Sequence, residues 1–231
     1  MKTFSITCID ALTYTPTIKA LKKTLETLKG LVDVKTVYWF SDIDFPDTVD
    51  CNVVWVKINR FKKFTDELNY ITLKLVPHLS REDYNLMVQG DGFAVNREAW
   101  DPQFLEYDYI GARWQDGRVG NGGFSLRSKK LLDAFLDVEI KYQTSQFPED
   151  VINSVENYVF DYCGDKVIPE DNIICKVYRP ILEQKYGIRY ADGDIADKFS
   201  IEYNMSSQWL GKSLGFHGKH GIASHYGITL D

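Results

Sequence analysis

The segment YNLMVQGDGF (residues 84–93) decides the fold prediction, because it joins an apolar run to a glycine-flanked carboxylate. Tyr84 to Gln89 predicts a buried strand, and Asp91 follows it between two glycines. A carboxylate in this place suits a hard divalent cation, which prefers oxygen ligands. Gln89-Gly90-Asp91-Gly92 also suits a plain turn, since Asp and Gly are common turn residues. The segment alone leaves both interpretations open.

Upstream of this segment, apolar runs alternate with helical patterns. A helix is expected with Thr15 as N-cap, Pro16 at its first position and Gly30 at its end. A second helix is expected to end near Pro77. Strands alternating with helices predict an α/β fold with a mostly parallel sheet flanked by helices. The expected strands are Phe4–Ile9, Val34–Phe40 and Val53–Ile58.

Carboxylates follow three of the predicted strands: Asp10, Asp42 and Asp91. In such sheets ligands bind beyond the carboxyl ends of the strands. The three side chains are therefore expected along one rim of the sheet.

The second half of the chain is less regular. A helix over Val151–Tyr162 is one interpretation of a stretch that is hard to place, and Pro180 should kink a later helix. The last thirty residues, rich in Gly, His, Ser and Tyr, predict a loop-rich segment over the rim. No linker divides the chain, so one domain is expected over residues 1–231, with halves at 1–90 and 91–231. The remaining expected elements are strands at Tyr107–Ala112 and within Gly120–Arg127, and helices at Ser128–Val138 and Asp171–Tyr186.

Composition excludes several classes of protein. Hydrophobic residues make up 44% and aromatic residues 14% of the 231 residues, which excludes disorder as the main state. The net charge of −6 argues against nucleic acid as a partner. Cysteines at positions 8, 51, 163 and 175 form no C-x-x-C pair, so neither a zinc ribbon nor a disulfide is expected. Without a signal peptide or membrane span, we expect a cytoplasmic protein, with work beside a membrane left open.

Three later motifs combine residues that can carry chemistry. The glycines of VGNGGFSLR (119–127) allow a ligand to approach main-chain amides, or form a hairpin turn. Pro169-Glu170-Asp171 offers a carboxylate at a helix start that can act as a general base, or a simple helix cap, and Pro148-Glu149-Asp150 is a rival copy. FHGKH (216–220) offers His for a metal and Lys219 for a phosphate, or a solvated loop.

The order of these motifs resembles the GT-A fold of nucleotide-sugar glycosyltransferases, in particular a small family of bacterial and viral glycosyltransferase-like proteins. Residues 84–220 carry the resemblance, and the N-terminal half is similar only in architecture. The matching segments are VQGDGF (88–93), EYDYIGARW (106–114), VGNGGFSLRS (119–128), PEDN (169–172), FSIEY (199–203) and GFHG (215–218).

The resemblance implies a metal site and a catalytic pair. Asp91 matches the last carboxylate of the D-x-D motif that holds Mn²⁺ or Mg²⁺ on the donor diphosphate, and Gln89 replaces the first. His217 matches the late histidine that completes that site. Asp171 matches the catalytic base of inverting members, beside Glu170.

The resemblance also implies how the two substrates bind. Gly122, Gly123, Phe124 and Ser125 match the strand between the donor and acceptor sites, and Asn121, directly before them, is expected to bind the acceptor or sugar with them. From strand order alone, Asp10 and Asp42 are expected near the ribose or base. Trp114 is either a stacking platform for a sugar or a core aromatic. The implied partners are a nucleotide-diphosphate sugar and a glycan or other hydroxyl acceptor.

The leading hypothesis is thus an inverting glycosyltransferase, and Gln89 keeps a non-catalytic nucleotide- or glycan-binding domain as the alternative. A nucleotidyltransferase is disfavoured because the loop DALTYTPT (10–17) has neither Gly nor Lys. The negative charge weighs against a glycosyltransferase that acts on DNA.

Overall fold

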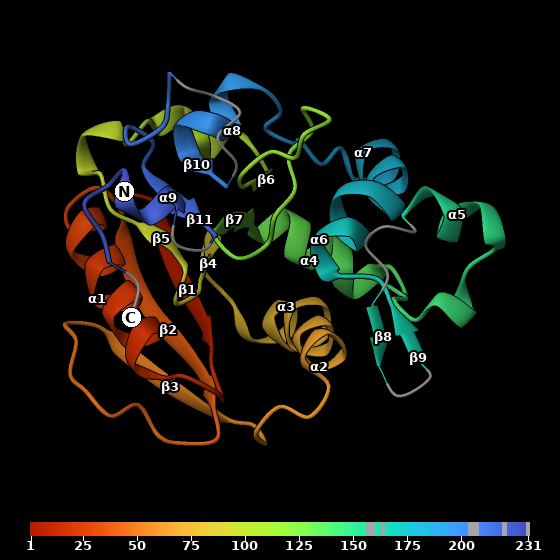
Figure 1. Cartoon of the computed structure of the whole chain (residues 1–231), viewed down its shortest axis with the longest axis horizontal. Coiled ribbons are helices and arrows are strands. Elements are labelled where there is room, and N and C mark those ends of the chain that lie inside the picture. The colour runs from red at the N-terminus through yellow and green to blue at the C-terminus, as the bar shows by residue number, and fades with distance from the viewer. Residues whose placement is uncertain (156–159, 163–164, 203–207, 219–220, 230–231) are drawn as a thin grey trace.

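The computed structural model describes residues 1–155, 160–162, 165–202, 208–218 and 221–229. In this part of the chain a six-stranded sheet has the order β3-β2-β1-β4-β7-β6 (Figure 1). The four N-terminal strands are parallel, and β7 is antiparallel to both of its neighbours. The predicted mostly parallel sheet flanked by helices is confirmed. The strands are β1 (Thr3–Ile9), β2 (Asp33–Ser41), β3 (Asn52–Lys57), β4 (Tyr84–Val88), β6 (Tyr109–Ile110) and β7 (Ser125–Ser128).

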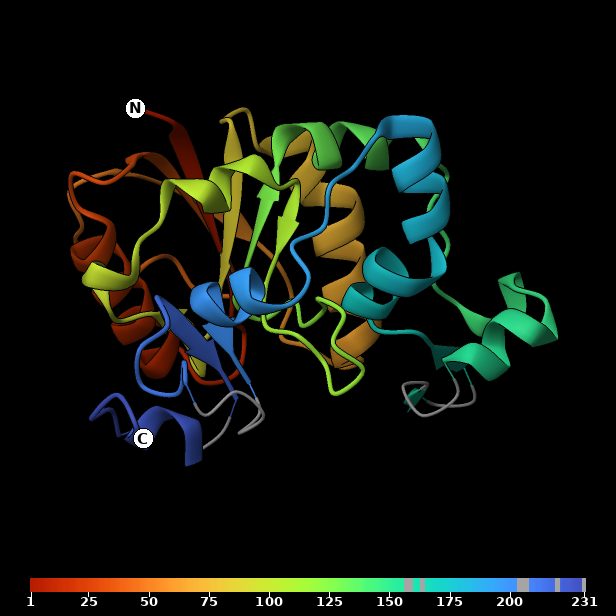
Figure 2. The ribbon, with the colours of Figure 1, turned by 90° about the horizontal axis from the view of Figure 1, so that it is seen from above.

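The sheet separates two hydrophobic clusters, because successive side chains of a strand point to opposite faces. On β2, Trp39 packs with α1 (Thr15–Leu28), whereas Phe40 packs on the opposite face. On β4, Leu86 and Met87 divide in the same way. Figure 2 shows the sheet between α1 and the helices α2 (Phe64–Tyr70) and α4 (Lys129–Asp137). Both faces are covered, so the strands can be apolar throughout.

The start of α1 differs from the expected Thr15 N-cap, because Thr15 is already helical and Tyr14 precedes it. The buried Asp10 carboxylate accepts hydrogen bonds from the amides of Leu12, Thr13 and Tyr14, so it fixes the loop that Thr15 was expected to cap. Tyr14 has φ 53° and ψ −63°, and Thr15 donates to the carbonyl of Thr13, which makes a tight γ-turn.

The second helix runs past the expected end near Pro77. It continues from α2 through the π-helical turn η1 (Ile71–Leu75) into α3 (Val76–Leu79). Pro77 lies in the first turn of α3, where its missing N–H costs least. The wider turn of η1 directly precedes it, and such turns accommodate breaks in the α-helical ladder.

The expected helix over Val151–Tyr162 is wrong in its second part. Among the described residues of this stretch, 151–154 belong to α5 (Glu149–Ser154), whereas β8 (Phe160–Tyr162) pairs with β9 (Asp165–Val167). Figures 1 and 2 both show this region projecting from the end of the molecule away from β1–β3. Next come α6 (Glu170–Asn172), the π-helical turn η6 (Ile173–Val177) and α7 (Arg179–Tyr186). Pro180 lies in the first turn of α7, so it separates α7 from η6 as expected.

The C-terminal segment has more regular structure than the expected loop. A second sheet has the order β10-β11-β5, built from β10 (Ser200–Ile201), β11 (Gly215–His217) and β5 (Gly92–Ala94). Strand β5 begins at the end of the QGDG turn and pairs with β11. This backbone pairing outweighs the preference of the glycine-rich C-terminal segment for a loop. The remaining elements are η2 (Arg97–Ala99), η3 (Pro102–Glu106), η4 (Thr144–Gln146), α8 (Asp194–Phe199) and α9 (Gly221–Ser224). No helix in the described ranges is long and apolar enough to cross a membrane.

Candidate functional site

A cavity of about 340 Å³ lies beyond the carboxyl end of β4, where the α/β rule places ligand sites. Its wall combines α2, the glycine loop before β7, the start of α6, and residues next to β4, β10 and β11. Residues that are far apart in the sequence therefore share one space. The lining residues are Thr65, Leu68, Asn69, Gln89, Trp114, Asn121, Gly122, Gly123, Pro169, Glu170, Asp171, Asn172, Glu202 and His217.

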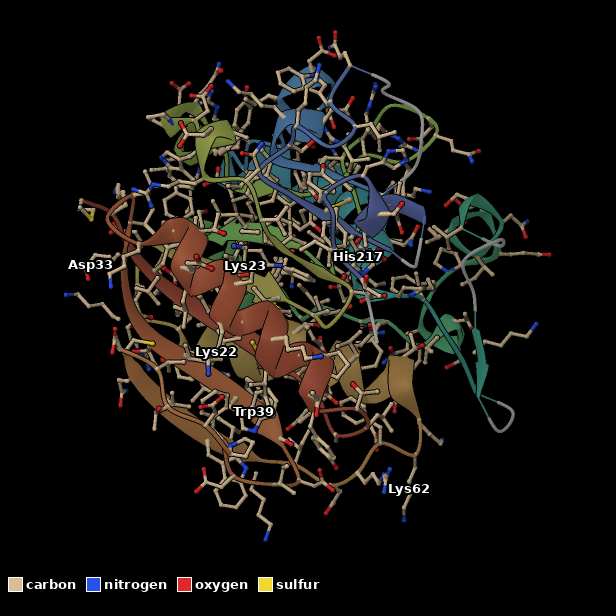
Figure 3. All side chains as sticks on the ribbon, turned by 60° about the vertical axis from the view of Figure 1, so that its left-hand side comes forward. Lys22, Lys23, Asp33, Trp39, Lys62 and His217 are labelled. Carbon is tan, nitrogen blue, oxygen red and sulfur yellow. The ribbon has the colours of Figure 1, made fainter. Side chains whose placement is uncertain are left out.

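The QGDG segment is both a turn and part of this site. Gln89 and Gly92 exchange backbone hydrogen bonds of 2.9 and 3.1 Å, so Gly90 and Asp91 form a two-residue turn. The turn leads into β5, whose Gly92 pairs with His217 of β11. Nε2 of His217 consequently lies 3.7 Å from Oδ1 of Asp91 and 3.3 Å from Oε1 of Gln89. Figure 3 shows His217 well separated from Lys22 and Lys23 of α1.

His217 is held among carboxylates. Its Nδ1 lies 3.5 Å from Oε1 of Glu202, on the side opposite to Asp91. Burial alone would lower the pKa of His217, but the carboxylates of Glu202 and Asp91 outweigh it and raise the pKa above its ordinary value. The imidazole therefore carries positive charge more readily than a free histidine.

The glycines of the loop leave room for side chains of the same chain. A Cβ on Gly122 would lie 1.9 Å from Oε1 of Glu170, and one on Gly123 would lie 2.0 Å from Nε2 of His217. A Cβ on Gly120 would lie 2.1 Å from the ring of Trp114. The sequence suggested close approach of a ligand or a hairpin turn. The structure shows instead that this space holds the side chains that form the site.

Glu170 is fixed by a buried ion pair. Its Oε1 accepts a hydrogen bond of 2.7 Å from Nη2 of Arg127, and both side chains are almost completely buried. Burial alone would lower the pKa of Arg127, but the charge of Glu170 raises it, so the guanidinium stays charged. Arg127 also lies over the ring of Tyr109, 5.7 Å from the ring centroid. Glu170 thus has a fixed position beneath the glycine loop.

Asp171 lies in the cavity wall, next to this pair. Burial and then the charge of Glu170 raise the pKa of Asp171 to about 7, although hydrogen bonds from Asn172 act in the opposite direction. The rival carboxylates, Glu149 and Asp150, are exposed at the start of α5 and do not line the cavity. The geometry therefore places the second Pro-Glu-Asp copy at the site.

The two carboxylates expected at the nucleoside lie outside the cavity wall. Asp10 also accepts hydrogen bonds from the hydroxyls of Thr13 and Thr17, so its oxygens are occupied within its own loop. Asp42 is partly exposed and accepts a hydrogen bond of 2.8 Å from the hydroxyl of Tyr14. The loop role of Asp10 explains why it turns inward.

Some of the other predicted residues line the cavity, and others hold the glycine loop in place. Trp114 lines the cavity but is only 5% exposed, and Nζ of Lys176 lies 4.3 Å from its ring centroid. Asn121 adopts φ 48° and its side chain accepts a hydrogen bond from the amide of Gly123. Ser125 is fully buried and donates to the carbonyl of Gly122, so it supports the loop from behind. Lys219 lies outside the described residues.

Three site residues were missed in the sequence. Glu202 directly follows β10. Arg127 lies two residues after Ser125 on β7. Asn69 lies on α2, and its side-chain amide donates a hydrogen bond to the carbonyl of Ile168. An acidic residue just after a strand, as in FSIEY, was the one available signal. Arg127 and Asn69 gave none, because their roles depend on partners more than 40 positions away.

In the described ranges, no group of three or more His, Cys, Asp and Glu side chains is arranged to hold a metal. Cys8, Cys51 and Cys175 are free thiols, and Cys163 lies outside the described residues.

Comparison with solved structures finds the same fold in known enzymes. A glycosyltransferase involved in glycosylation of the major capsid of the virus PBCV-1 is similar with a TM-score of 0.52 at 10% identity, over 94% of this chain and 92% of that one. The galactosyltransferase LgtC, solved with donor and acceptor sugar analogues, is similar with a TM-score of 0.51 at 11% identity, over 94% and 87% of the two chains. A search of curated protein sequences gave no match.

At such low identities these likenesses show the fold, which is that of GT-A glycosyltransferases. The sequence itself matches one family, described as "Protein of unknown function (DUF5672)", over residues 56–217. Because this match spans well over half of the chain, the protein belongs to the DUF5672 family.

Proposed function

We propose that this protein transfers a sugar from a nucleotide-diphosphate sugar to an acceptor hydroxyl, with inversion at the anomeric carbon. The observation that carries the proposal is Asp171 in the cavity wall, with a pKa raised to about 7, beside the glycine loop and His217. A base titrating near neutral pH combines sufficient basicity with a useful ionised fraction. The glycosyltransferase fold supports the same reaction class.

Asp171 presents one oxygen to the acceptor. The amide and the side-chain nitrogen of Asn172 donate to Oδ1 at 2.7 and 3.0 Å, which leaves Oδ2 to accept a proton. As that proton moves to Oδ2, the acceptor oxygen bonds to the anomeric carbon. The bond from this carbon to the diphosphate breaks, and its electron pair leaves with the phosphate. Glu170, locked by Arg127, holds the position of Asp171 and takes no proton in this scheme.

The donor set fits a divalent cation, Mn²⁺ or Mg²⁺. Oδ1 of Asp91 and Nε2 of His217 are 3.7 Å apart, and two ligands of one octahedral ion at about 2.1 Å lie about 3 Å apart. Asp91 and His217 would hold the ion, with Gln89 beside them and diphosphate oxygens completing its shell. When bound, the ion would neutralise charge on the leaving diphosphate. Glu202, near Nδ1, orients the imidazole so that Nε2 faces Asp91.

The test compares two aspartates that occupy the same place in a Pro-Glu-Asp motif. Nucleotide sugars are first screened by thermal shift with Mn²⁺, and nucleoside diphosphate release is then measured for the binding donor. Asp171→Asn should lower turnover by roughly 10²–10⁴ with donor affinity nearly unchanged, whereas Asp150→Asn should retain activity. Equal losses in both variants would contradict the role of Asp171. Donor binding without release in the wild type would favour a binding domain.

A further inference from the structure

Among the described residues, the cavity combines several carboxylates with few positively charged side chains. Glu170, Asp171 and Glu202 line it, and Asp91 lies beside it. Arg127 neutralises Glu170 from below, so its charge is not available to a ligand. His217 is the one basic side chain among the described residues that line the cavity, and it lies between the carboxylates of Asp91 and Glu202.

The cavity wall is also rich in unused hydrogen-bond acceptors. Four of the lining residues carry a buried side-chain oxygen without a hydrogen-bond partner among the described residues: Asn69 Oδ1, Glu170 Oε2, Asn172 Oδ1 and Glu202 Oε2. Asn69, Glu170 and Asn172 are themselves no more than 5% exposed. A buried acceptor left without a donor is costly, so these oxygens indicate a ligand that supplies O–H or N–H groups.

We infer that the cavity binds the acceptor as a sugar ring that is rich in hydroxyl groups and carries no negative charge. This rests on the proposed function and adds the class of acceptor. The hydroxyls of such a ring would donate to the unpartnered oxygens. A ring carboxylate or phosphate would instead meet Asp171 and Glu202, and no Lys or Arg is among the described residues that line the cavity. The proposed metal ion would be neutralised by the donor diphosphate. The volume of about 340 Å³ is at the lower end for small-ligand pockets, which span about 300–1,000 Å³.

The matched probes are methyl glucoside and methyl galactoside against methyl glucuronide and methyl galacturonide, which differ only in a carboxylate at C6. Binding is measured by ligand-observed NMR titration without any donor, at a pH where Asp171 is ionised. At least one neutral glycoside should bind roughly tenfold or more tightly than its uronide. Asp171→Asn should narrow the ratio of neutral-glycoside to uronide affinity several-fold, because it removes one of the charges that the uronide carboxylate would meet. Asp150→Asn, with its exposed carboxylate, should leave the ratio unchanged.

Equal or tighter binding of the uronides would overturn the inference, and so would an unchanged ratio in Asp171→Asn or no binding of any neutral glycoside. The donor-free readout separates this failure from failure of the proposed function. If the protein prefers neutral glycosides but releases no nucleoside diphosphate, the inference about the acceptor holds and the proposed glycosyltransferase activity is contradicted. If the protein is active and uses uronides as well as neutral glycosides, the proposed activity holds and the inference about the acceptor is contradicted.

Discussion

Gly122→Ala should destabilise the protein far more than an ordinary glycine-to-alanine change. The new Cβ would lie 1.9 Å from Oε1 of Glu170 and 2.6 Å from its Cδ, whereas ordinary contacts begin near 3.4 Å. The carboxylate must therefore move by about 1.5 Å. Movement of a side-chain end is usually cheap, but Glu170 is buried and paired at 2.7 Å with the fully buried Arg127. Moving the carboxylate that far breaks its contact with Arg127.

Breaking one buried ion pair costs about 3–5 kcal/mol, because each charge stays buried after it has lost its partner. In a chain of this size about 1 kcal/mol corresponds to a Tm change of roughly 2–4 °C, so Gly122→Ala should lower Tm by about 6–20 °C. Differential scanning calorimetry measures it. Gly117→Ala is the control, because a Cβ there contacts nothing within 4 Å and φ +84° is its one cost, about 1–2 kcal/mol.

Two results would refute this reasoning. A Tm for Gly122→Ala within about 2 °C of that for Gly117→Ala would show that Glu170 moves freely and that its pairing with Arg127 does not lock the loop. A large loss of stability with an unchanged rate of the proposed sugar transfer would show that the pair serves the fold alone.

Two further predictions concern metal and pH. His217→Ala should weaken the affinity for the bound nucleoside diphosphate by about 10–100-fold in Mn²⁺ and change it little in excess chelator, and calorimetry that found equal affinities in Mn²⁺ would remove His217 from the site. Because the raised pKa of Asp171 keeps this carboxyl protonated below about pH 7, the wild-type kcat should fall as pH drops through that value, whereas the residual rate of Asp171→Asn should show no inflection there.

Local patterns of residues predict most of the first half of the fold. Apolar runs such as Phe4–Ile9 and Val34–Phe40 are short, continuous and separated by a helical pattern, and burial on both faces requires this composition. The prediction failed where local preference was overruled by pairing, as in β8 and in β11, whose partners are set by backbone hydrogen bonds to other segments. Thr15 is not the N-cap, because the carboxylate of Asp10, five positions earlier, accepts the hydrogen bonds of the loop amides.

The site divides in the same way. Motif order singled out Asp91, Asp171 and His217, and it favoured the second of the two Pro-Glu-Asp copies because a helix and then FSIEY follow it. Only the tertiary structure placed Asp171 in a cavity wall and left Asp150 exposed.

Only the tertiary structure, likewise, brought Arg127 to Glu170 and Glu202 to His217. The physical reason is how far apart in the sequence the interacting residues are. Strand and helix patterns follow from neighbours a few residues apart, whereas ion pairs, pKa shifts and close packing against a glycine depend on atoms that only folding brings within a few ångström.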